Sequence, residues 1–124
     1  MFKRWFGRKE TLEATAVRGV YYLCEHDGTP ERQLKDELNQ LFQSRTDPAK
    51  AYLAVVRYED APGPPGVALC VTGVALDERN GLVGQIGIVF ARLFNIQQHL
   101  DILFPTPEEE VQLSKVCRPF FARR

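Results

Sequence analysis

Apolar residues cluster into separate segments along the chain, and their spacing predicts the order β-α-β-β-α-β-α. Segments rich in β-branched and aromatic residues predict four strands, at 16–24, 51–58, 67–75 and 99–104. Helical spacing predicts three helices, from Pro30 to Ser44, over 82–97, and from Thr106 to about Val116. A helix is the alternative for 16–24, because the preceding residues ETLEATA favour helix.

Two of the helices carry clear start signals. Leu34, Leu38 and Leu41 recur at helical spacing, and Thr29 supplies a predicted N-cap before Pro30. In the last helix, Thr106 precedes a proline and the acids 108–110, which favour the positive end of the helix dipole.

The middle helix contains glycines at three-residue spacing. Gly81, Gly84 and Gly87 would form a smooth stripe, which we expect to allow close packing on a sheet. Each glycine also weakens the helix by up to about 1 kcal/mol relative to alanine. Asp77 to Asn80 is expected to be a turn or cap, and the proline-rich stretch 59–66 to be a loop joining antiparallel strands.

The first six elements predict an α+β fold of the ferredoxin-like, split βαβ kind. This is a βαββαβ order with an antiparallel sheet, two helices on one face and here an extra C-terminal helix. We expect one domain at residues 13–124, preceded by a basic and aromatic tail at 1–12.

The predicted sheet lacks the alternation of a solvated face. AYLAVVRY and VALCVTGV are apolar on both sides apart from Arg57 and Thr72, so we expect the second face to be covered. The possible covers are the last helix, Phe120 and Phe121, the N-terminal aromatics, or a second copy of the chain. The candidate binding residues on this face or in the tail are Tyr22, Tyr52, Arg57, Tyr58, Phe120 and Phe121.

Composition is ordinary for a globular protein, with 44% hydrophobic and 26% charged residues. Lys plus Arg and Asp plus Glu both total 16, so the formal net charge is zero and nucleic-acid binding is not expected. Cys24, Cys70 and Cys117 form no CxxC pair and are expected to be buried, reduced thiols that act as small hydrophobes in a cytoplasmic protein.

The N-terminal stretch MFKRWFGRKE mixes basic and aromatic residues. It is not a signal peptide, because no continuous apolar run follows the basic start, and no run approaches the roughly 18 residues of a membrane span. Residues 2–9 could make weak membrane-surface contact, with aromatic rings at the headgroups. The alternatives are a frayed tail or aromatics that cover the core.

The pattern contains no recognisable catalytic machinery. Cys24 and His26 would share a strand face, but a metal site would also need His99 and Asp101, and structural turn residues are the favoured interpretation. The glycines of GLVGQIG match neither a dinucleotide fingerprint nor a P-loop. We therefore predict no catalytic residue, no metal and no cofactor.

Four segments together resemble a known bacterial family. TPERQLKDELNQLFQSR, AYLAVVRY, HLDILFP and CRPFF are similar to the C-terminal domain of enhanced-serine-sensitivity (SseB-type) proteins, over roughly residues 17–121. The chain differs in its proline-rich loop and in having no separate N-terminal domain before the matching part. The resemblance implies a cytoplasmic bacterial protein, carries over no catalytic residue, and links the family to serine metabolism through phenotype alone.

The leading functional hypothesis is a non-enzymatic protein-interaction or binding module, with a homodimer through the sheet face or an unknown protein as its partner. The alternative is a small-molecule regulatory domain that senses amino acids, which is an analogy of fold alone. An enzyme that uses Cys24 or His26 is the third hypothesis.

Overall fold

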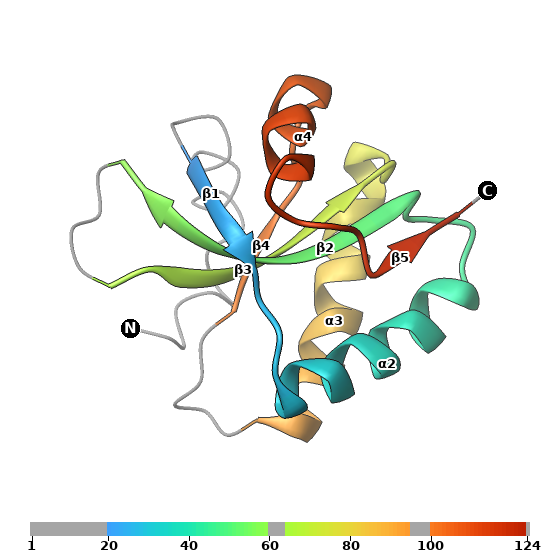
Figure 1. Ribbon diagram of the computed structural model, residues 1–124. Coiled ribbons are helices and arrows are strands. Elements are labelled where there is room, and N and C mark those ends of the chain that lie inside the picture. Colours follow the sequence, from blue (N-terminus) through green and yellow to red (C-terminus); the bar gives the residue numbers. More distant parts are fainter. Residues whose placement is uncertain (1–19, 60–63, 95–99, 124) are drawn as a thin grey trace.

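The computed structural model describes residues 20–59, 64–94 and 100–123, which form an α+β fold (Figure 1). The strands are β1 (Val20–Glu25), β2 (Lys50–Tyr58), β3 (Gly66–Thr72), β4 (Asp101–Leu103) and β5 (Phe121–Ala122). The helices are α2 (Thr29–Gln43), the 3-10 turn η2 (Leu76–Glu78), α3 (Arg79–Leu93) and α4 (Pro107–Ser114). Helices α2 and α3 lie on one face of the sheet, and α4 lies on the other (Figure 1).

The sheet is mixed, and its order follows the chain as β1-β2-β3-β4. β2 pairs antiparallel with β1, β3 and β5, whereas β3 and β4 are parallel. β2 is the longest described strand and is buried along most of its length. It is therefore central, with β3 along one edge and β1 and β5 following each other along the other.

This order does not confirm the ferredoxin-like prediction. In a split βαβ unit, a third strand separates the two parallel strands that a helix connects. Here α2 connects β1 and β2, which are direct antiparallel neighbours, and α3 connects β3 and β4, which are direct parallel neighbours. The α+β class and the element order through α4 agree with the prediction. The all-antiparallel sheet does not agree, and β5 lies in the segment 117–124, where the sequence indicated only a C-terminal tail.

Helix boundaries are close to those predicted, with differences that local geometry explains. Gly28, not Thr29, holds the N-cap position of α2, and no side chain caps that helix. In α4 the predicted start is confirmed. Thr106 Oγ1 accepts from the Glu109 amide (3.2 Å), and Glu109 Oε1 accepts from the Thr106 amide (2.8 Å).

Other ends shift by a few residues. α4 ends at Ser114, before the predicted Val116, and α3 begins at Arg79, inside the expected turn. β3 ends at Thr72, because Gly73 has a φ of 75° and turns the chain. The loop prediction for 59–66 falls partly on residues 60–63, outside the described residues, but β2 and β3 are antiparallel neighbours as expected.

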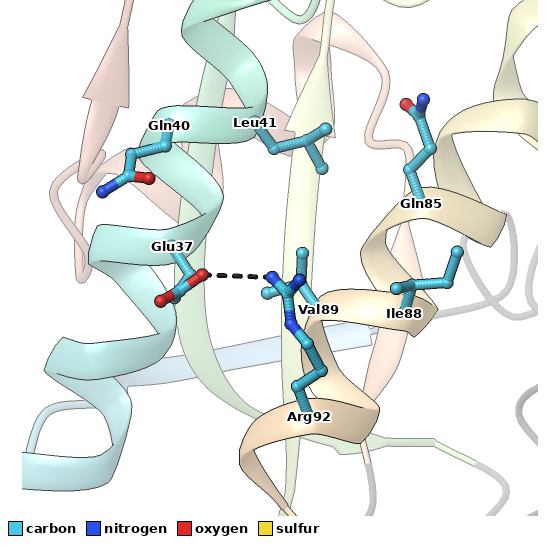
Figure 2. A pocket seen from close by; sticks show the side chains of 7 residues that line it. All are labelled: Glu37, Gln40, Leu41, Gln85, Ile88, Val89 and Arg92. Atoms are coloured by element: carbon cyan, nitrogen blue, oxygen red, sulfur yellow. Dashed lines mark hydrogen bonds and ion pairs between the residues drawn. The ribbon is translucent and has the colours of Figure 1, made fainter.

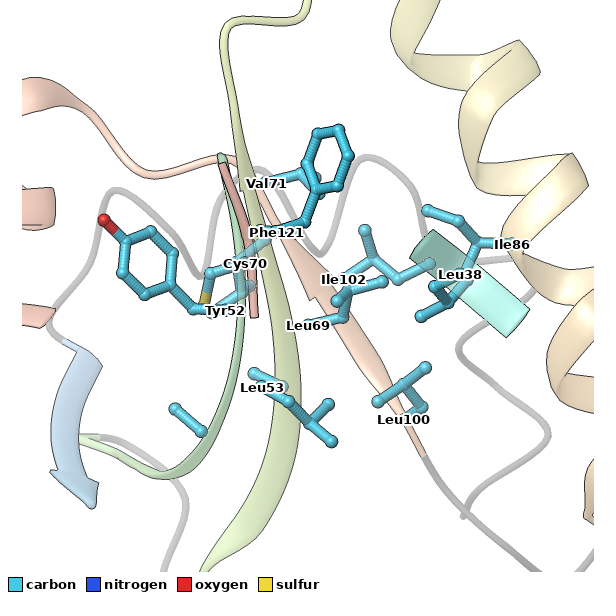
Figure 3. Close-up of a cluster of buried hydrophobic side chains, with 14 of the residues drawn as sticks. Leu38, Tyr52, Leu53, Leu69, Cys70, Val71, Ile86, Leu100, Ile102 and Phe121 are labelled. Atoms are coloured by element: carbon cyan, nitrogen blue, oxygen red, sulfur yellow. The ribbon is translucent and has the colours of Figure 1, made fainter. Parts of the chain in front are cut away.

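The core has two layers, one on each face of the sheet. Figure 3 shows Leu38, Ile86 and Ile102 on the side of the α2 and α3 helices, and Tyr52 and Cys70 on the opposite side. On that second side Leu113 of α4 is fully buried. The second face is therefore covered by the final helix, as predicted, over the part of the sheet near Tyr52.

The prediction that the three glycines of α3 pack on the sheet is wrong. Gly87 is buried, but Gly81 and Gly84 are exposed, and a Cβ built at either would meet nothing within 4 Å. The buried positions are instead Leu82, Ile86 and Phe90. At 3.6 residues per turn, each step of three residues changes the direction around the helix axis by about 60°. The three glycines therefore point in different directions and cannot all face the sheet.

Candidate functional site

The structure brings three of the predicted binding residues, all tyrosines, onto the second face of the sheet. Tyr52 and Tyr58 are an even number of residues apart on β2, so both side chains point to the same face of the sheet. Tyr22 of β1 lies opposite Val56 of β2 and points to that face as well. Tyr52 is only 1% exposed, and its Oη donates to Glu110 Oε2 of α4 at 2.6 Å. Tyr58 Oη donates to Asp101 Oδ2 at 2.5 Å. These tyrosines thus hold the second face together.

Burial raises the pKa of these three phenols, which are protonated at neutral pH even at the ordinary tyrosine value. Desolvation is the largest cause that raises the pKa of Tyr22, Tyr52 and Tyr58 above the ordinary tyrosine value. The neighbouring carboxylates of Glu110 and Asp101 raise the pKa of Tyr52 and Tyr58 further. The protonated phenols of Tyr52 and Tyr58 donate to these carboxylates. Tyr22 Oη is buried and has no hydrogen-bond partner among the described atoms.

The other predicted binding residues lie elsewhere. Phe121 is 8% exposed and its ring centroid is 5.4 Å from that of Phe42 in α2, while the Phe120 centroid is 6.4 Å from the same ring. The two phenylalanines therefore close the end of the α2 layer, so they are not the cover of the second face, which was one of the four alternatives. Arg57 is exposed opposite Tyr21 on β1, on the other face from the tyrosines.

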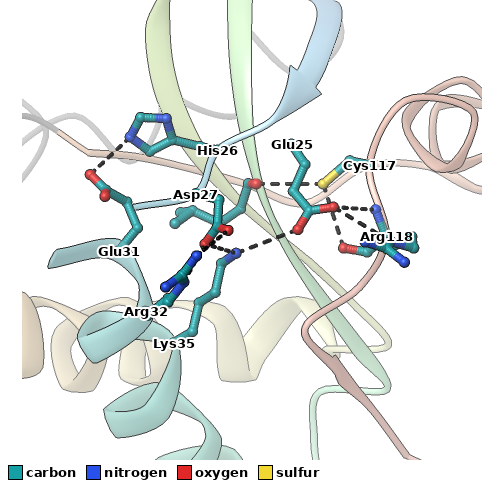
Figure 4. Close-up of polar contacts among 9 residues, drawn as sticks. Glu25, His26, Asp27, Glu31, Arg32, Lys35, Cys117 and Arg118 are labelled. Carbon is teal, nitrogen blue, oxygen red and sulfur yellow. Dashed lines mark hydrogen bonds and ion pairs between the residues drawn. The ribbon is translucent and has the colours of Figure 1, made fainter. Parts of the chain in front are cut away.

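A network of ion pairs joins β1, the start of α2 and the segment after α4 (Figure 4). Lys35 Nζ lies 3.7 Å from Glu25 Oε2 and 3.6 Å from Asp27 Oδ1. Arg118 Nε lies 3.7 Å from Glu25 Oε1. The hydrogen bonds that Arg32 donates to Asp27 are the largest cause of the lowered pKa of this carboxyl group. Each carboxylate here already faces a cation of the same chain, so the network ties the elements together.

The structure gives the two residues of the Cys24–His26 hypothesis different surroundings. Cys24 is exposed on β1, and His26 Nε2 lies 3.0 Å from Glu31 Oε2 of α2 (Figure 4). Asp101 is bound to Tyr58, and His99 is outside the described residues. Across 20–59, 64–94 and 100–123, no three His, Cys, Asp or Glu side chains are grouped to hold a metal ion.

Burial also keeps the other two thiols protonated. Desolvation raises the pKa of Cys70 above the ordinary thiol value, and it is the largest cause that raises the pKa of Cys117 to about 11. Cys117 Sγ donates to the Leu53 carbonyl at 3.4 Å. Both thiols are core groups, as predicted, whereas the prediction that Cys24 is also buried is wrong, because Cys24 is exposed on β1.

A groove of about 340 Å³ opens between α2 and α3 on the outside of the molecule (Figure 2). Leu41 and Val89 contribute apolar lining, with the amides of Gln40 and Gln85 beside them. Arg92 Nη2 of α3 reaches across to Glu37 Oε1 of α2 at 3.1 Å. Arg45, which follows the end of α2, donates from Nη1 to Gln85 Oε1 of α3 at 2.6 Å. The groove is therefore held open between two fixed helices.

The outer face of α3 continues this groove as an apolar surface. Ile88, which lines the groove, is 63% exposed, and Gly81, Gly84 and Ala91 are exposed on the same side of the helix. From Asn80 to Ala91 the helix carries no charged residue. The outer face of α3 thus exposes one large aliphatic side chain among small, uncharged residues, where a surface helix usually carries charged ones.

Sequence reasoning did not find this surface, although one signal was present. The buried stripe runs through Leu82, Ile86 and Phe90, and Ile88 falls on the opposite side of a helix with that phase. The predicted inward position of the glycines concealed the outward face. The groove itself depends on how α2 and α3 pair across the sheet, which local spacing does not contain.

Two further predictions concern contact with a membrane. The proposed membrane-surface residues 2–9 lie outside the described residues. Over the part of the chain that is described, none of the helices combines the length and the apolar character needed to cross a membrane.

Comparisons with protein-family models, with curated proteins and with solved structures give no match for this chain. The resemblance to SseB-type proteins therefore stays a prediction.

Proposed function

We propose that this domain is a non-enzymatic protein-binding module that contacts its partner through the groove between α2 and α3 and the adjoining outer face of α3. The observation that carries the proposal is the 63% exposure of Ile88 on a helix face without charge. Burying an aliphatic side chain of this size stabilises a contact by about 1.5–3 kcal/mol. The Glu37–Arg92 ion pair and the hydrogen bond from Arg45, just after α2, to Gln85 keep the surface in place before a partner arrives, which lowers the entropy lost on binding.

The sheet face is a weaker candidate for the same role. α4 lies across it, with Tyr52 bound to Glu110 and Leu113 fully buried. A partner on that part of the sheet would have to displace α4 and expose this apolar layer. The outer face of α3 requires no such rearrangement.

The placement of the nucleophilic side chains supports binding over catalysis. Cys70 and Cys117 are buried with raised pKa values, and His26 is engaged by Glu31 rather than by a thiol.

In-cell photo-crosslinking at Ile88 tests the proposal. A photoreactive amino acid replaces Ile88 in one variant and Val111 in a matched control, because Val111 is a similar aliphatic residue of α4 that is 55% exposed. We expect a covalent adduct from position 88 and none, or far less, from position 111. Equal adducts from both positions, or none from position 88, would contradict the proposal.

Amino-acid sensing is a second candidate, which one feature of the groove favours. Glu37 and Arg92 place opposite charges 3.1 Å apart beside the apolar residues Leu41 and Val89. An amino acid could place its ammonium on Glu37 and its carboxylate on Arg92, with an apolar side chain along the groove. A ligand at 100 times its dissociation constant would stabilise the fold by about 2.7 kcal/mol. A thermal-shift screen with amino acids that gives no shift, or an equal shift in Arg92→Ala, would exclude this candidate.

A further inference from the structure

We propose that the partner at this groove is a second copy of the chain, bound through an antiparallel pairing of the two α3 helices. This inference rests on the proposed function and specifies its partner. It is carried by the symmetric placement of the exposed residues of α3 and by the charges at the two ends of that helix.

The exposed uncharged side of α3 is symmetric about Ile86. Gly84 and Ile88 are each two residues from Ile86, and Gly81 and Ala91 are each five residues from it. At 3.6 residues per turn, these four positions lie within about 40° of the direction opposite the Ile86 side chain. Ile86 itself is fully buried, so the centre of this side points directly away from the core.

A two-fold axis through this point pairs each large residue with a small one. Two antiparallel helices related by such an axis bring Ile88 of one copy onto Gly84 of the other, and the reverse contact forms by symmetry. The Ile88 side chain projects into solvent, and the space where a Cβ of Gly84 would lie has no atom within 4 Å. Gly81 meets Ala91 at each end, so the helix axes can approach to the lower part of the usual 8–10 Å range.

The charges at the ends of α3 fit the same antiparallel arrangement. Arg92 lies in the last turn of α3, and Asp77 and Glu78 precede its first turn. The two-fold axis places Arg92 of one copy beside the Asp77–Asn80 end of the other. Asp77 is exposed and makes no ion pair with any described residue of its own chain. A parallel pairing would instead place the Arg92 side chains of the two copies together.

The size of the contact sets its expected strength. One pair of helices covers less than the ~800 Å² per partner of a standard stable interface. The groove rim adds Gln40 and Gln85 at its margin. The dimer is therefore expected to form in the micromolar range or above, and its population should depend on protein concentration.

Sedimentation equilibrium of the purified full chain tests the inference, over about 10 µM to about 1 mM. The wild type should approach twice the mass of the chain as its concentration rises. Ile88→Glu should weaken association by at least about tenfold, because it places a charge on the apolar contact. Val111→Glu, on α4, should associate as the wild type does. A wild type that stays monomeric throughout, or a Val111→Glu variant that is equally impaired, would overturn the dimer.

Disulfide trapping tests the register, in a Cys24→Ser background that removes the exposed native thiol. A mixture of the Gly84→Cys and Ile88→Cys variants should give a crosslinked dimer at least about tenfold faster than a mixture of Gly84→Cys with Val111→Cys, since proximity raises the effective concentration. Equal rates in the two mixtures would exclude the antiparallel register.

Charge reversal tests the ends of the interface. Asp77→Arg should weaken the dimer by facing Arg92 of the other copy, and adding Arg92→Asp should restore it. Failure of the double variant to recover would count against this pairing.

The dimer and the binding function can fail separately. If the purified chain is monomeric but the in-cell adduct at position 88 has a mass other than twice the chain, the dimer is wrong and the binding module stands. If position 88 gives no adduct and the chain is monomeric, both are wrong.

Discussion

α2 and α3 have the same length and lie side by side on one face of the sheet, yet their outer surfaces differ (Figure 1). α2 exposes Arg32, Gln33 and Asp36 to solvent, as expected for a surface helix. α3 exposes Gly84 and Ile88 in the corresponding middle part and has no charge between its ends. The comparison shows that covering the sheet explains the inner faces of both helices but not the outer face of α3.

The two helices are also anchored differently. The C-terminal end of α2 is held by Arg123, whose Nη2 donates to the Phe42 carbonyl at 2.7 Å and whose Nε donates to the Pro48 carbonyl at 3.1 Å. In the last turn of α3, Arg92 instead pairs with Glu37 of α2, and the inner face of α3 packs on the sheet. The end of α2 is thus held through its backbone carbonyls, and the end of α3 through a side-chain ion pair and apolar packing.

The largest expected effect separates the inner from the outer face of α3. Leu82→Ala should lower the free energy of unfolding by about 2–5 kcal/mol, because Leu82 is fully buried, and Leu38→Ala in α2 should cost a similar amount. Ile88→Ala should stay within about 0.5 kcal/mol of the wild type in dilute protein. Urea unfolding at low concentration measures all three. An Ile88→Ala cost equal to that of Leu82→Ala would show that Ile88 belongs to the core.

A smaller effect should follow from releasing the end of α2. Arg123→Ala removes the two hydrogen bonds to carbonyls and the contact of its guanidinium with the Phe121 ring, 5.1 Å from its centroid. The expected cost is about 1–2 kcal/mol, because these are charge-assisted bonds in a partly buried place. Arg118→Ala, at a side chain that is almost fully exposed, serves as the control and should have little effect.

Gly84→Ala should change stability in the opposite direction. The added methyl group would meet no atom within 4 Å, and alanine favours helix over glycine by about 0.5–1 kcal/mol. Gly73→Ala is the contrasting variant, because its φ is 75° and the new Cβ would lie 2.6 Å from that of Ala49. Thermal unfolding should therefore show stabilisation in the first and destabilisation in the second. Destabilisation by Gly84→Ala would mean that position 84 is already occupied by a neighbour.

The smallest effect concerns the bridge between the two helices. A double-mutant cycle with Glu37→Gln and Arg92→Gln should give a coupling of about 0.2–1 kcal/mol that shrinks as salt is added, because both side chains are substantially exposed. A larger coupling that does not depend on salt would indicate that the groove is closed to solvent.

Local signals in the sequence predicted the helices better than they predicted the sheet. Pro30 and Thr106 mark the beginnings of α2 and α4 through contacts within a few residues, so the pattern contains that information. The Ala51–Phe121 pairing of β5 with β2 joins residues far apart in the chain, and no local pattern specifies it. The same limit explains why the parallel pairing of β3 and β4 was not anticipated.

The candidate binding residues show a similar division. The sequence correctly indicated that the second face needs a cover, because β2 is apolar on both sides, and α4 provides it. It did not distinguish an apolar residue that packs inside, such as Phe121, from one that remains outside, such as Ile88. That distinction depends on the position of α3 relative to the sheet, which is a property of the whole fold.

A dilution series of two-dimensional ¹H–¹⁵N NMR spectra tests the central claim most directly, because it reports on α2 and α3 in the same sample. Between about 1 mM and about 20 µM, the amide signals of Gly81, Gly84, Ile88 and Ala91 should shift with concentration. The signals of Arg32, Gln33 and Asp36 on α2 should stay fixed. Shifts centred on α2 or on the tyrosine face of the sheet, or no shift at any position, would contradict the claim that the outer face of α3 is the contact surface.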